Sequence, residues 1–417
     1  MKTNKVMAVP KLRFPGFESD ETWELSNFNN VYDLKITNSL SRAKLNYDEG
    51  DIKNIHYGDI HTKFSSTFNV EKEEVPYINE EKTSFKCEVD DFCIEGDIVL
   101  ADASEDIKDI GKAIEITNIS HEKVVCGLHT IHARPKQNKL YVGFGAYLFQ
   151  SSFIRKQIQL ESQGAKVLGL SKGRLEKISL LIPKKQEQQK IADCLSSLDA
   201  LIKAESEHLD ALKSHKTGLL QKLFPADGET VPKFRFGEFK DDEDWEVSSL
   251  SKVCEMKAGD FVQASEIHDV SQNDLYPCYG GNGLRGFTDS YTHDGVFPLI
   301  GRQGALCGNI NLIKGQFHAT EHALVCTPKP NIDVIWLYYQ LVLLDLNKYA
   351  TGQAQPGLSV KNLNDIPCKV PLLLEQRKIA DCLSSLDNLI QFKADKIKAL
   401  RYHKQGLMQQ LFPEGGI

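Results

Sequence analysis

Two segments of the chain place apolar residues at alternating steps of four and three positions, and this pattern predicts two long helices. The first seam comprises Ile191, Leu195, Leu198, Ile202, Glu205, Leu209, Leu212, Lys216, Leu219 and Leu223; the second comprises Ile379, Leu383, Leu386, Ile390, Lys393, Ile397, Leu400, Lys404, Leu407 and Leu411. A repeat every 3.5 residues is typical of a coiled-coil seam. Each segment follows a proline and ends at Leu-Phe-Pro, as a helix bounded by breakers does. Roughly 36 residues at 1.5 Å rise give a rod of about 54 Å.

The two helical segments are copies of each other. Residues 187–225 and 375–413 align at an offset of 188 with 24 of 39 positions identical. A second repeat relates 9–23 to 231–245 at an offset of 222. The chain therefore repeats a frame around two middles of unequal length, and such repeats indicate the architecture before any other signal.

The two seams are expected to pack on each other in antiparallel fashion, because parallel packing would need a connection that returns the full length of the rod. Glu205 and Lys393 occupy the same repeat position with opposite charge, and we predict that they fix the register of the pair. Two solvated charges are the alternative. Each seam could instead pack into the core of its own domain, but the matching exteriors of the copies argue against this.

The two middles predict compact domains of short strands. They run from about 27 to 183 and from about 248 to 371, with β-branched and aromatic runs broken by Gly, Asn and Asp. Helices are expected at 147–160 and 333–347. Both middles end alike, since 164, 169–171, 175, 178 and 183 match the residues 188 positions later. The predicted fold is α+β, with two mixed α/β domains that are divergent copies of one fold, joined by two long antiparallel helices. The expected boundaries are 1–186, 187–225, 226–374 and 375–417.

Composition describes an ordinary soluble protein. Of the 417 residues 41% are hydrophobic and 26% charged. No apolar run reaches the ~20 residues of a membrane span, and the N-terminus has no apolar core of signal-peptide length. The ten cysteines are scattered, without the two-residue spacing of zinc ligands. These features predict a cytoplasmic protein without a metal site.

Charge is unevenly distributed along the first middle. The chain as a whole carries −7, which argues against a generic nucleic-acid coat. Residues 71–110 hold 4 Lys/Arg and 14 Asp/Glu, and residues 121–190 hold 13 Lys/Arg and 4 Asp/Glu. The basic stretch could contact phosphates while the acidic stretch sets orientation. Two ordinary solvated surfaces are the alternative.

Motifs of catalysis are missing from the sequence. The chain has no Gly-x-x-x-x-Gly-Lys-Ser/Thr phosphate loop. Residues 281–286 spell Gly-x-Gly-x-x-Gly, but the polar, turn-rich segment after them is no helix, so the dinucleotide-binding context fails. His318 and His322 have the spacing of a metal pair without a third ligand, and we interpret them as core or surface histidines.

The chain resembles the specificity subunit of type I DNA restriction–modification systems over almost its whole length. The features that carry the resemblance are Glu-Gln-x-Lys-Ile-Ala at 187–192 and 375–380, the Leu-Phe-Pro endings, Trp-Glu at 23–24 and 245–246, and the Gly-rich stretches 279–283 and 301–306. The helical repeats are the specific part of this match.

The resemblance implies a protein without catalysis of its own. Each of its two target-recognition domains would recognise one half of a gapped, asymmetric DNA site, and the helices would set the spacing and dock two adenine-N6 methyltransferase subunits. Two restriction subunits can join such a complex. S-adenosylmethionine, ATP and magnesium would bind these partners and not this chain, which agrees with the absence of a methyltransferase tetrapeptide of the Asp/Asn-Pro-Pro-Tyr type.

Candidate DNA contacts follow from residue chemistry, because Arg, Lys, Asn and Gln recognise base edges and phosphates. In the first domain they are Arg134, Lys136, Lys139, Lys172 and Arg174; in the second they are Tyr279, Asn282, Arg285, Arg302, Gln303 and Lys361. For each of them a solvated side chain is the alternative. Three other functions stay open: a coiled-coil adaptor that never contacts DNA, a self-sufficient enzyme, and a specificity chain that serves a fused methyltransferase–nuclease.

Overall fold

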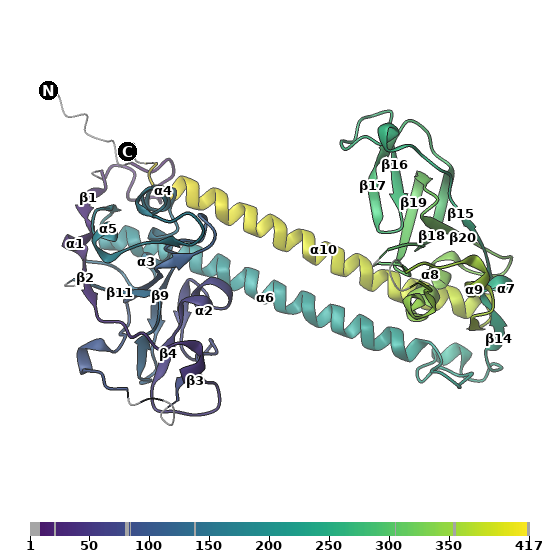
Figure 1. Cartoon of the computed structure of the whole chain (residues 1–417), viewed down its shortest axis with the longest axis horizontal. Helices are drawn as coiled ribbons and strands as arrows, with labels where there is room; N and C mark the ends of the chain where they lie inside the picture. Colours follow the sequence, from purple (N-terminus) through teal and green to yellow (C-terminus); the bar gives the residue numbers. More distant parts are fainter. Residues whose placement is uncertain are drawn as a thin grey trace. The chain divides into compact units, whose positions relative to one another are not determined.

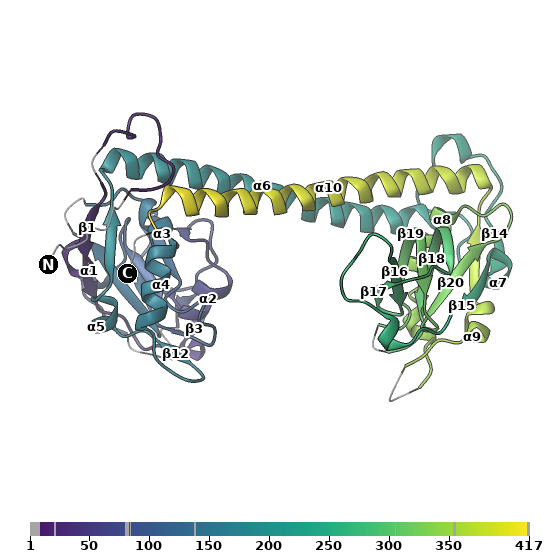
Figure 2. The same cartoon turned by 90° about the horizontal axis from the view of Figure 1, so that it is seen from above.

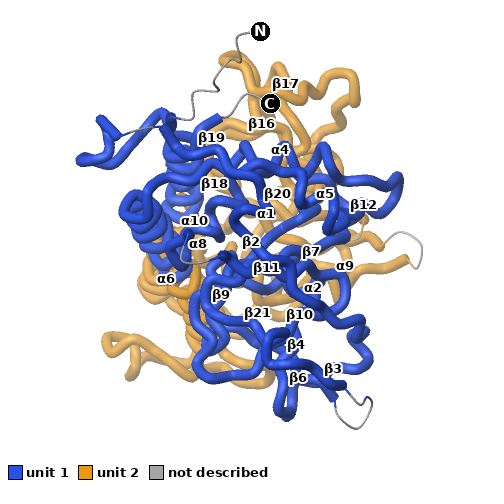
Figure 3. The backbone as a smooth tube through the Cα atoms, turned by 90° about the vertical axis from the view of Figure 1, so that its left-hand side faces the viewer, with its two compact units in different colours: residues 1–205, 396–417 blue, residues 206–395 orange. Residues whose placement is uncertain are grey.

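The computed structural model describes residues 9–20, 22–79, 83, 85–136, 139–304, 306–352 and 356–414. Its helices and strands are labelled in the two views of Figures 1 and 2. Ala305 of the predicted Gly-rich loop 301–306 lies outside the described residues. The chain divides into two compact units (Figure 3): unit 1 comprises 1–205 and 396–417, and unit 2 comprises 206–395. Both unit boundaries fall inside the long helices, and the expected domain boundaries at 187 and 375 stay a prediction.

The two long helices form where the 3.5-residue pattern predicts them. Helix α6 spans Lys185–Leu223 and α10 spans Leu373–Leu411. Each begins two residues after a proline and ends at Leu-Phe-Pro. All ten predicted seam positions of each helix are buried or half-buried, while most positions between them are exposed. The predicted helices are therefore confirmed, and the burial pattern agrees with the predicted seams.

Within each unit, the segments of α6 and α10 pack side by side in antiparallel fashion. In unit 1 Lys404 Nζ lies 2.6 Å from Asp199 Oδ1, and Lys396 Nζ lies 2.6 Å from Glu205 Oε1. The numbers fall along one helix as they rise along the other, which defines the antiparallel sense. In unit 2 Lys216 pairs with Asp387. The proposed register role of Glu205 and Lys393 stays a prediction, and Lys396 is an additional partner of Glu205.

Unit 1 is built around a five-stranded sheet in the order β2-β11-β7-β9-β5. A four-stranded sheet, β10-β4-β6-β3, and the pairs β1-β13 and β12-β8 complete its β structure. The strands are β1 Glu24–Asn27, β2 Tyr32–Lys35, β3 Leu45–Asn46, β4 Lys53–Ile55, β5 Thr67–Asn69, β6 Tyr77–Ile78, β7 Ile98–Ala101, β8 Ala103–Ser104, β9 Ala113–Asn118, β10 Val124–Cys126, β11 Thr130–Pro135, β12 Leu168–Gly169 and β13 Ser179–Ile182. The short helices are α1 Phe28–Val31, η1 Arg42–Lys44, α2 Tyr57–Thr62, η2 Val89–Asp91, α3 Phe144–Leu148, α4 Ser152–Glu161 and α5 Lys172–Leu175.

Unit 2 contains a six-stranded sheet in the order β15-β20-β18-β19-β16-β17 and the pair β14-β21. Its strands are β14 Glu246–Ser249, β15 Cys254–Ala258, β16 Tyr276–Gly280, β17 Gly283–Thr288, β18 His293–Gly301, β19 Ile310–Ala319, β20 Ala323–Pro328 and β21 Pro367–Val370. Its short helices are η3 Gly237–Phe239, α7 Leu250–Val253, η4 Ala264–Glu266, α8 Val334–Leu343, η5 Leu346–Tyr349 and α9 Val360–Asn364. The helices expected at 147–160 and 333–347 are each divided in two, into α3 and α4 and into α8 and η5.

The two units share one strand arrangement. In unit 1 β11 pairs with β2 and β7, β7 pairs with β9, and β5 lies parallel to β9. In unit 2 β20 pairs with β15 and β18, β18 pairs with β19, and β16 lies parallel to β19. Both β11 and β20 end in a proline, which pairs with the first residue of β2 or β15. The prediction that the middles are divergent copies of one fold is therefore confirmed.

A repeated set of contacts ties each domain to the start of one long helix. In unit 1 Arg13 donates to both carboxylate oxygens of Glu187, at 2.9 and 2.6 Å, and both side chains are buried. In unit 2 Arg235 makes the same bidentate contact with Glu375, at 3.0 and 2.8 Å. Bidentate arginine–carboxylate pairs fix geometry as well as charge. In both units, the repeat that precedes the domain (offset 222) thus contacts the helical repeat that follows it (offset 188).

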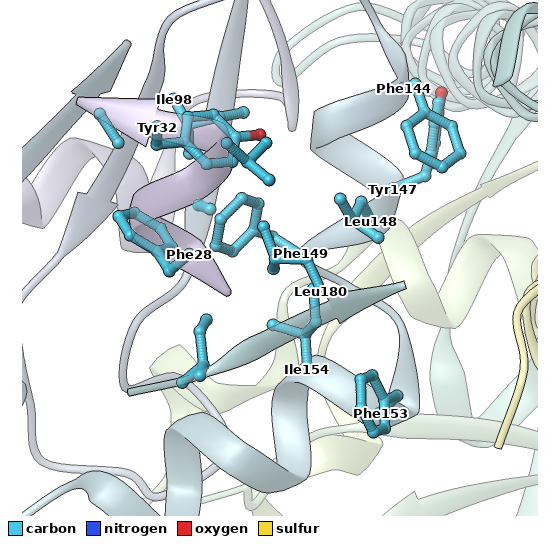
Figure 4. Close-up of a cluster of buried hydrophobic side chains, with 14 of the residues drawn as sticks. Phe28, Tyr32, Ile98, Phe144, Tyr147, Leu148, Phe149, Phe153, Ile154 and Leu180 are labelled. Atoms are coloured by element: carbon cyan, nitrogen blue, oxygen red, sulfur yellow. The ribbon is translucent and has the colours of Figure 1, made fainter. Parts of the chain in front are cut away.

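Aromatic residues form the centre of the larger core of unit 1. Figure 4 shows Phe28, Tyr32 and Phe149 close together, with Phe28 and Tyr32 stacked at a centroid distance of 5.1 Å. Trp23 contacts Phe412 edge-on at 5.7 Å. The same cluster contains Ile191, Leu195, Leu411 and Phe412, so the ends of the long helices are part of the domain core.

A buried carboxyl group caps the short helix α3. Glu115 is 1% exposed and accepts hydrogen bonds from the backbone N–H groups of Gly143 and Ala146, both at 2.8 Å. Burial raises the pKa of Glu115 to about 8, although these backbone N–H groups act to lower it. Tyr147 of α3 donates to Asp199 of α6 at 2.9 Å, so the cap positions the contact between domain and helix.

No helix of the described residues is long and apolar enough to span a membrane.

Removal of Arg13 is expected to destabilise unit 1. Arg13→Met would leave Glu187 buried without its partner, and we expect a loss of about 2–5 kcal/mol in the free energy of unfolding. Native-state hydrogen exchange in β1 and β13 measures this loss. Lys11→Met is the matched control, because the Lys11–Glu414 pair is exposed on both sides, and it should cause no measurable change. Equal effects of the two variants would contradict the assignment.

The raised pKa of Glu115 predicts a pH-dependent stability for α3. Between about pH 4.5 and 8 the folded unit retains a proton that the unfolded chain has lost, so stability falls as pH rises, by up to about 1.4 kcal/mol per pH unit. Hydrogen exchange of residues 143–149, compared with Glu115→Gln at each pH, measures this slope. The variant should lack the slope, and an identical pH dependence in both proteins would refute the raised pKa.

Candidate nucleic-acid interface

The loops that vary between the two units emerge at one end of the central strands, away from the frame. In unit 2 the register places Gly301 of β18 opposite Ala323 of β20 at this end. At the other end of β20, Pro328 lies opposite Cys254, which directly follows helix α7 near the start of the domain. Loops on a rigid scaffold are where recognition residues are commonly placed.

A pocket of about 400 Å³ opens among these loops in unit 2. It is lined by Gly280, Gly281, Asn282, Gly283, Leu284, Arg285, Gln303, Gly304 and His322. Three of the predicted DNA-contact residues, Asn282, Arg285 and Gln303, therefore converge on one site, and all three are exposed. Among the described residues, none of these three side chains has a hydrogen bond or an ion pair, so their donors and acceptors are available to a ligand.

The glycines of this pocket form a tight hairpin. Residues 281–286 lie on the turn between β16 and β17 and in β17 itself, where a dinucleotide-binding motif would begin a helix. Gly283 has a φ of 102°, which favours glycine. A Cβ atom at Gly281 would lie 2.9 Å from the carbonyl oxygen of His322. The hairpin thus approaches the β19–β20 turn closely. The expectation that no helix follows the motif is confirmed, and the absence of a cofactor role stays a prediction.

The remaining predicted residues of unit 2 lie around the pocket or farther away. Arg302 is half-buried, and its Nε lies 3.4 Å from the carbonyl oxygen of Leu358. Tyr279 packs edge-on against Phe317 at 6.0 Å, and burial raises the pKa of Tyr279. Lys361 is exposed on α9.

The corresponding site of unit 1 has the same backbone and different side chains. The N–H of Asp102 donates to His129 O at 3.0 Å, and the N–H of Leu170 donates to Asp102 O at 2.8 Å. In unit 2 Arg302 makes the equivalent contacts, to His322 O at 2.9 Å and from the N–H of Leu358 at 2.9 Å. Asp102 of unit 1 thus occupies the position of Arg302. Its side chain lies 3.1 Å from Nδ1 of His129, so the charge at this position is reversed between the units.

A pocket of about 490 Å³ also lies among these loops in unit 1. Its lining includes Asp102, His129, Gln163, Ser171 and Arg174. Arg174 is the one predicted DNA contact of unit 1 at this site. Asp102, His129 and Gln163 were not among the residues predicted from the sequence. An alignment of β11 with β20 on their terminal prolines would have matched His129 with His322, but the two strands share no other residue at matched positions.

Comparison with known proteins identifies one family over most of the chain. The family model described as the type I restriction modification DNA specificity domain matches it twice, over 21–214 and 242–402. The chain belongs to this family. Because each match ends inside one long helix, the repeat of the specificity family corresponds to a domain together with much of the helix that follows it.

Individual specificity subunits agree with this assignment. The chain is 43% identical over 153 residues to the type I restriction enzyme EcoprrI specificity subunit of Escherichia coli, a match that covers 36% of this chain and 38% of that protein. It is 23% identical over 418 residues to a putative type I restriction enzyme MjaX specificity subunit of Methanocaldococcus jannaschii, covering 94% and 93% of the two chains. The solved S subunit of a type I system from M. genitalium has the same fold, with a TM-score of 0.65 at 16% identity, over 98% of this chain and all of that one.

Several basic residues predicted to contact DNA are engaged within unit 1 of this specificity protein. Arg134 is the clearest case, because its side chain is 15% exposed and donates to Asp97, to Asp90 and to the carbonyl oxygen of Phe92 at 2.6–3.3 Å. All its donor nitrogens are occupied, so we exclude Arg134 from the candidate interface.

The neighbouring basic residues are also engaged, although they keep more exposure. The Nζ atoms of Lys136 and Lys139 donate to the backbone oxygens of Asn29 and Asn30, and that of Lys172 donates to Lys35 O. Arg174 pairs with Glu161 at 3.4 Å. Much of the positive charge of 121–190 is thus paired with carbonyl oxygens and carboxylates of its own unit. These contacts do not support the interpretation of that stretch as one basic face.

His318 and His322 each contact a different residue. His318 Nε2 lies 3.4 Å from the carbonyl oxygen of Asp260, and His322 Nε2 lies 3.2 Å from Glu321 Oε1. Within the described residues, neither belongs to a group of three potential metal ligands.

Substitution of Arg134 should lower the stability of unit 1 and not remove a DNA contact. Arg134→Ala leaves Asp97 buried without its arginine, so we expect unit 1 to lose about 2–4 kcal/mol of stability. Arg285→Ala, the matched control, removes an exposed arginine and should leave the stability of unit 2 unchanged. Hydrogen exchange resolved by unit measures both. Retained stability in Arg134→Ala would return this residue to the interface.

Proposed function

We propose that this chain is the DNA-recognition component of a type I restriction–modification complex, and that each unit recognises one half of a bipartite site through the loops around its pocket. Members of this family assemble with the other subunits of a type I system and with DNA. The observation that carries the proposal is that the two units share one backbone arrangement but carry loops with different charges. A protein that recognises a bipartite site needs two different sets of contact residues in two equivalent positions, one for each half-site.

The pocket of unit 2 has suitable chemistry for base edges. Arg285 can donate two parallel hydrogen bonds to guanine, and Asn282 and Gln303 can each pair with adenine in the same bidentate manner. Arg302, with Lys361 nearer the surface, adds positive charge for phosphates. In unit 1 Arg174, His129 and Gln163 are the corresponding donors and acceptors, and Lys136, Lys139 and Lys172 remain candidates for phosphate contacts.

The long helices supply the spacing and the docking surface in this proposal. Two methyltransferase subunits, with two restriction subunits beside them, would perform methylation, translocation and cleavage, and S-adenosylmethionine, ATP and magnesium would bind there. Half-sites read by paired modules are commonly about one helical turn, ~10 bp, apart. The coiled-coil adaptor without DNA binding stays an outcome of the test. We expect the complex in the cytoplasm, with the DNA.

Adenine methylation provides the direct test. Coexpression with the methyltransferase encoded beside this chain, followed by single-molecule sequencing, should give a gapped two-part motif with one methylated adenine in each half. A complex that forms but adds no methylation would favour the adaptor.

Two variants resolve the contribution of the unit 2 pocket. Arg285→Ala should relax or abolish one half of the motif and weaken binding by ~1–3 kcal/mol, because a base contact is lost. Lys252→Ala removes an exposed charge on α7, at the frame end of the sheet, and should leave the motif unchanged. If Arg285→Ala weakens binding to every sequence equally and lowers its salt dependence, Arg285 contacts phosphate instead.

A further inference from the structure

Two thiols and an imidazole converge in the interior of unit 1, outside the candidate interface. Cys93 follows η2, Cys126 ends β10 and His132 lies in β11. The two Sγ atoms are 3.4 Å apart, and one ring nitrogen of His132 lies within 4.8 Å of both. The three residues are 3%, 1% and 0% exposed. Their separations of 33 and 6 residues explain why the spacing of cysteines in the sequence predicted no metal site.

A carboxylate holds the imidazole of His132 in one orientation. His132 Nε2 lies 2.7 Å from Asp97 Oδ2, and Arg134 donates to both oxygens of the same carboxylate. With Asp97 bound at Nε2, the nitrogen available to a ligand is Nδ1.

That nitrogen is the feature that the rest of the fold does not explain. Nδ1 of His132 is buried and has no hydrogen-bond partner among the described residues. A buried polar atom without a partner costs about 1–3 kcal/mol. A metal-ligating histidine commonly has one ring nitrogen bound by a carboxylate, which leaves the other nitrogen for the metal.

We propose that Cys93 Sγ, Cys126 Sγ and His132 Nδ1 bind one Zn²⁺ ion. Thiolate and imidazole are the ligands that zinc prefers, and three protein donors leave a fourth position for solvent. Two Zn–S bonds of ~2.3 Å at a tetrahedral angle place the sulfurs about 3.8 Å apart, so the present sulfur separation has to widen by only a few tenths of an ångström.

Charge balance also favours a divalent ion. Binding releases the two thiol protons to solvent, and two thiolates with Zn²⁺ sum to zero. The adjacent Asp97 and Arg134 also sum to zero. This matters because the two cysteines lie in an apolar cluster with Val99, Ile116 and Val124, where an unbalanced charge would be costly.

The described residues of unit 2 form no such group, although the unit shares the strand arrangement. Strand register places Val325 of β20 at the position of His132, both opposite the third residue from the end of the neighbouring strand. Unit 2 has a buried cysteine on the same strand, Cys326, but no histidine beside it. The ion would therefore be specific to unit 1. It would fix the segment around η2, which also carries the Asp90 and Phe92 contacts of Arg134, onto β10 and β11.

The full chain, purified under anaerobic reducing conditions without chelators, is the material for the test. We expect close to one zinc per chain by elemental mass spectrometry. Exchange for Co²⁺ should give a thiolate-to-cobalt charge-transfer band in the near ultraviolet and intense visible bands of a tetrahedral ion. Cys93→Ser, Cys126→Ser and His132→Gln should each abolish or strongly weaken binding. Cys326→Ser, the matched buried cysteine of unit 2, should bind as the wild type does.

Three results would overturn the site. They are a folded wild-type chain that takes up neither Zn²⁺ nor Co²⁺, a Cys126→Ser variant that binds Co²⁺ as tightly as the wild type, and a Cys93–Cys126 disulfide that persists under these reducing conditions. The cobalt spectrum of the wild type decides the matter even if the variants do not fold. Asp97→Asn serves as a graded variant, and loss of its positioning contact should weaken affinity by roughly 10–100-fold.

Discussion

A buried arginine–glutamate contact at the start of each long helix is the constraint on which both units depend. Arg13 reaches Glu187 across 174 residues of chain, and Arg235 reaches Glu375 across 140. The glutamine that follows each glutamate completes the junction. Gln188 bonds to Tyr141 N, Lys139 O and Pro183 O, and Gln376 bonds to Asp333 N, Asn331 O and Pro371 O. The Glu-Gln pair thus joins the segment before the domain, the domain itself and the helix after it, which explains physically why this dipeptide opens both helices.

This frame explains how the loops can differ while their positions stay the same. The backbone contacts of Asp102 and Arg302 are equivalent, and a carboxylate in one unit is replaced by a guanidinium in the other. Neither side chain is needed for the strand pairing around it. Recognition can therefore change at such positions without a cost in folding, whereas a change at Glu187 or Trp23 would be felt through the whole unit.

The predictable parts of this molecule are those encoded by period and repetition. The seams from Ile191 and from Ile379 could be located because helical packing imposes a fixed spacing. The Gly-rich loop of unit 2 could be located because tight turns need glycine. The role of Arg134 could not be predicted, since a count of charges does not show that Asp97 lies directly before the neighbouring strand β7. The Cys93, Cys126 and His132 group was equally hidden, because strand pairing, and not sequence spacing, brings these residues together.

The division of the chain into units also has a consequence for the order of synthesis. Unit 2 is continuous, from 206 to 395, and all its residues emerge from the ribosome in one stretch. Unit 1 is interrupted, and its core includes Leu411 and Phe412. At translation rates of ~5–20 residues per second, the roughly 200 intervening residues take about 10–40 s. Most of unit 1 is thus synthesised first, but its core can be completed only after unit 2 has been made. Until then, Trp23 and Phe144 lack their contacts with Phe412.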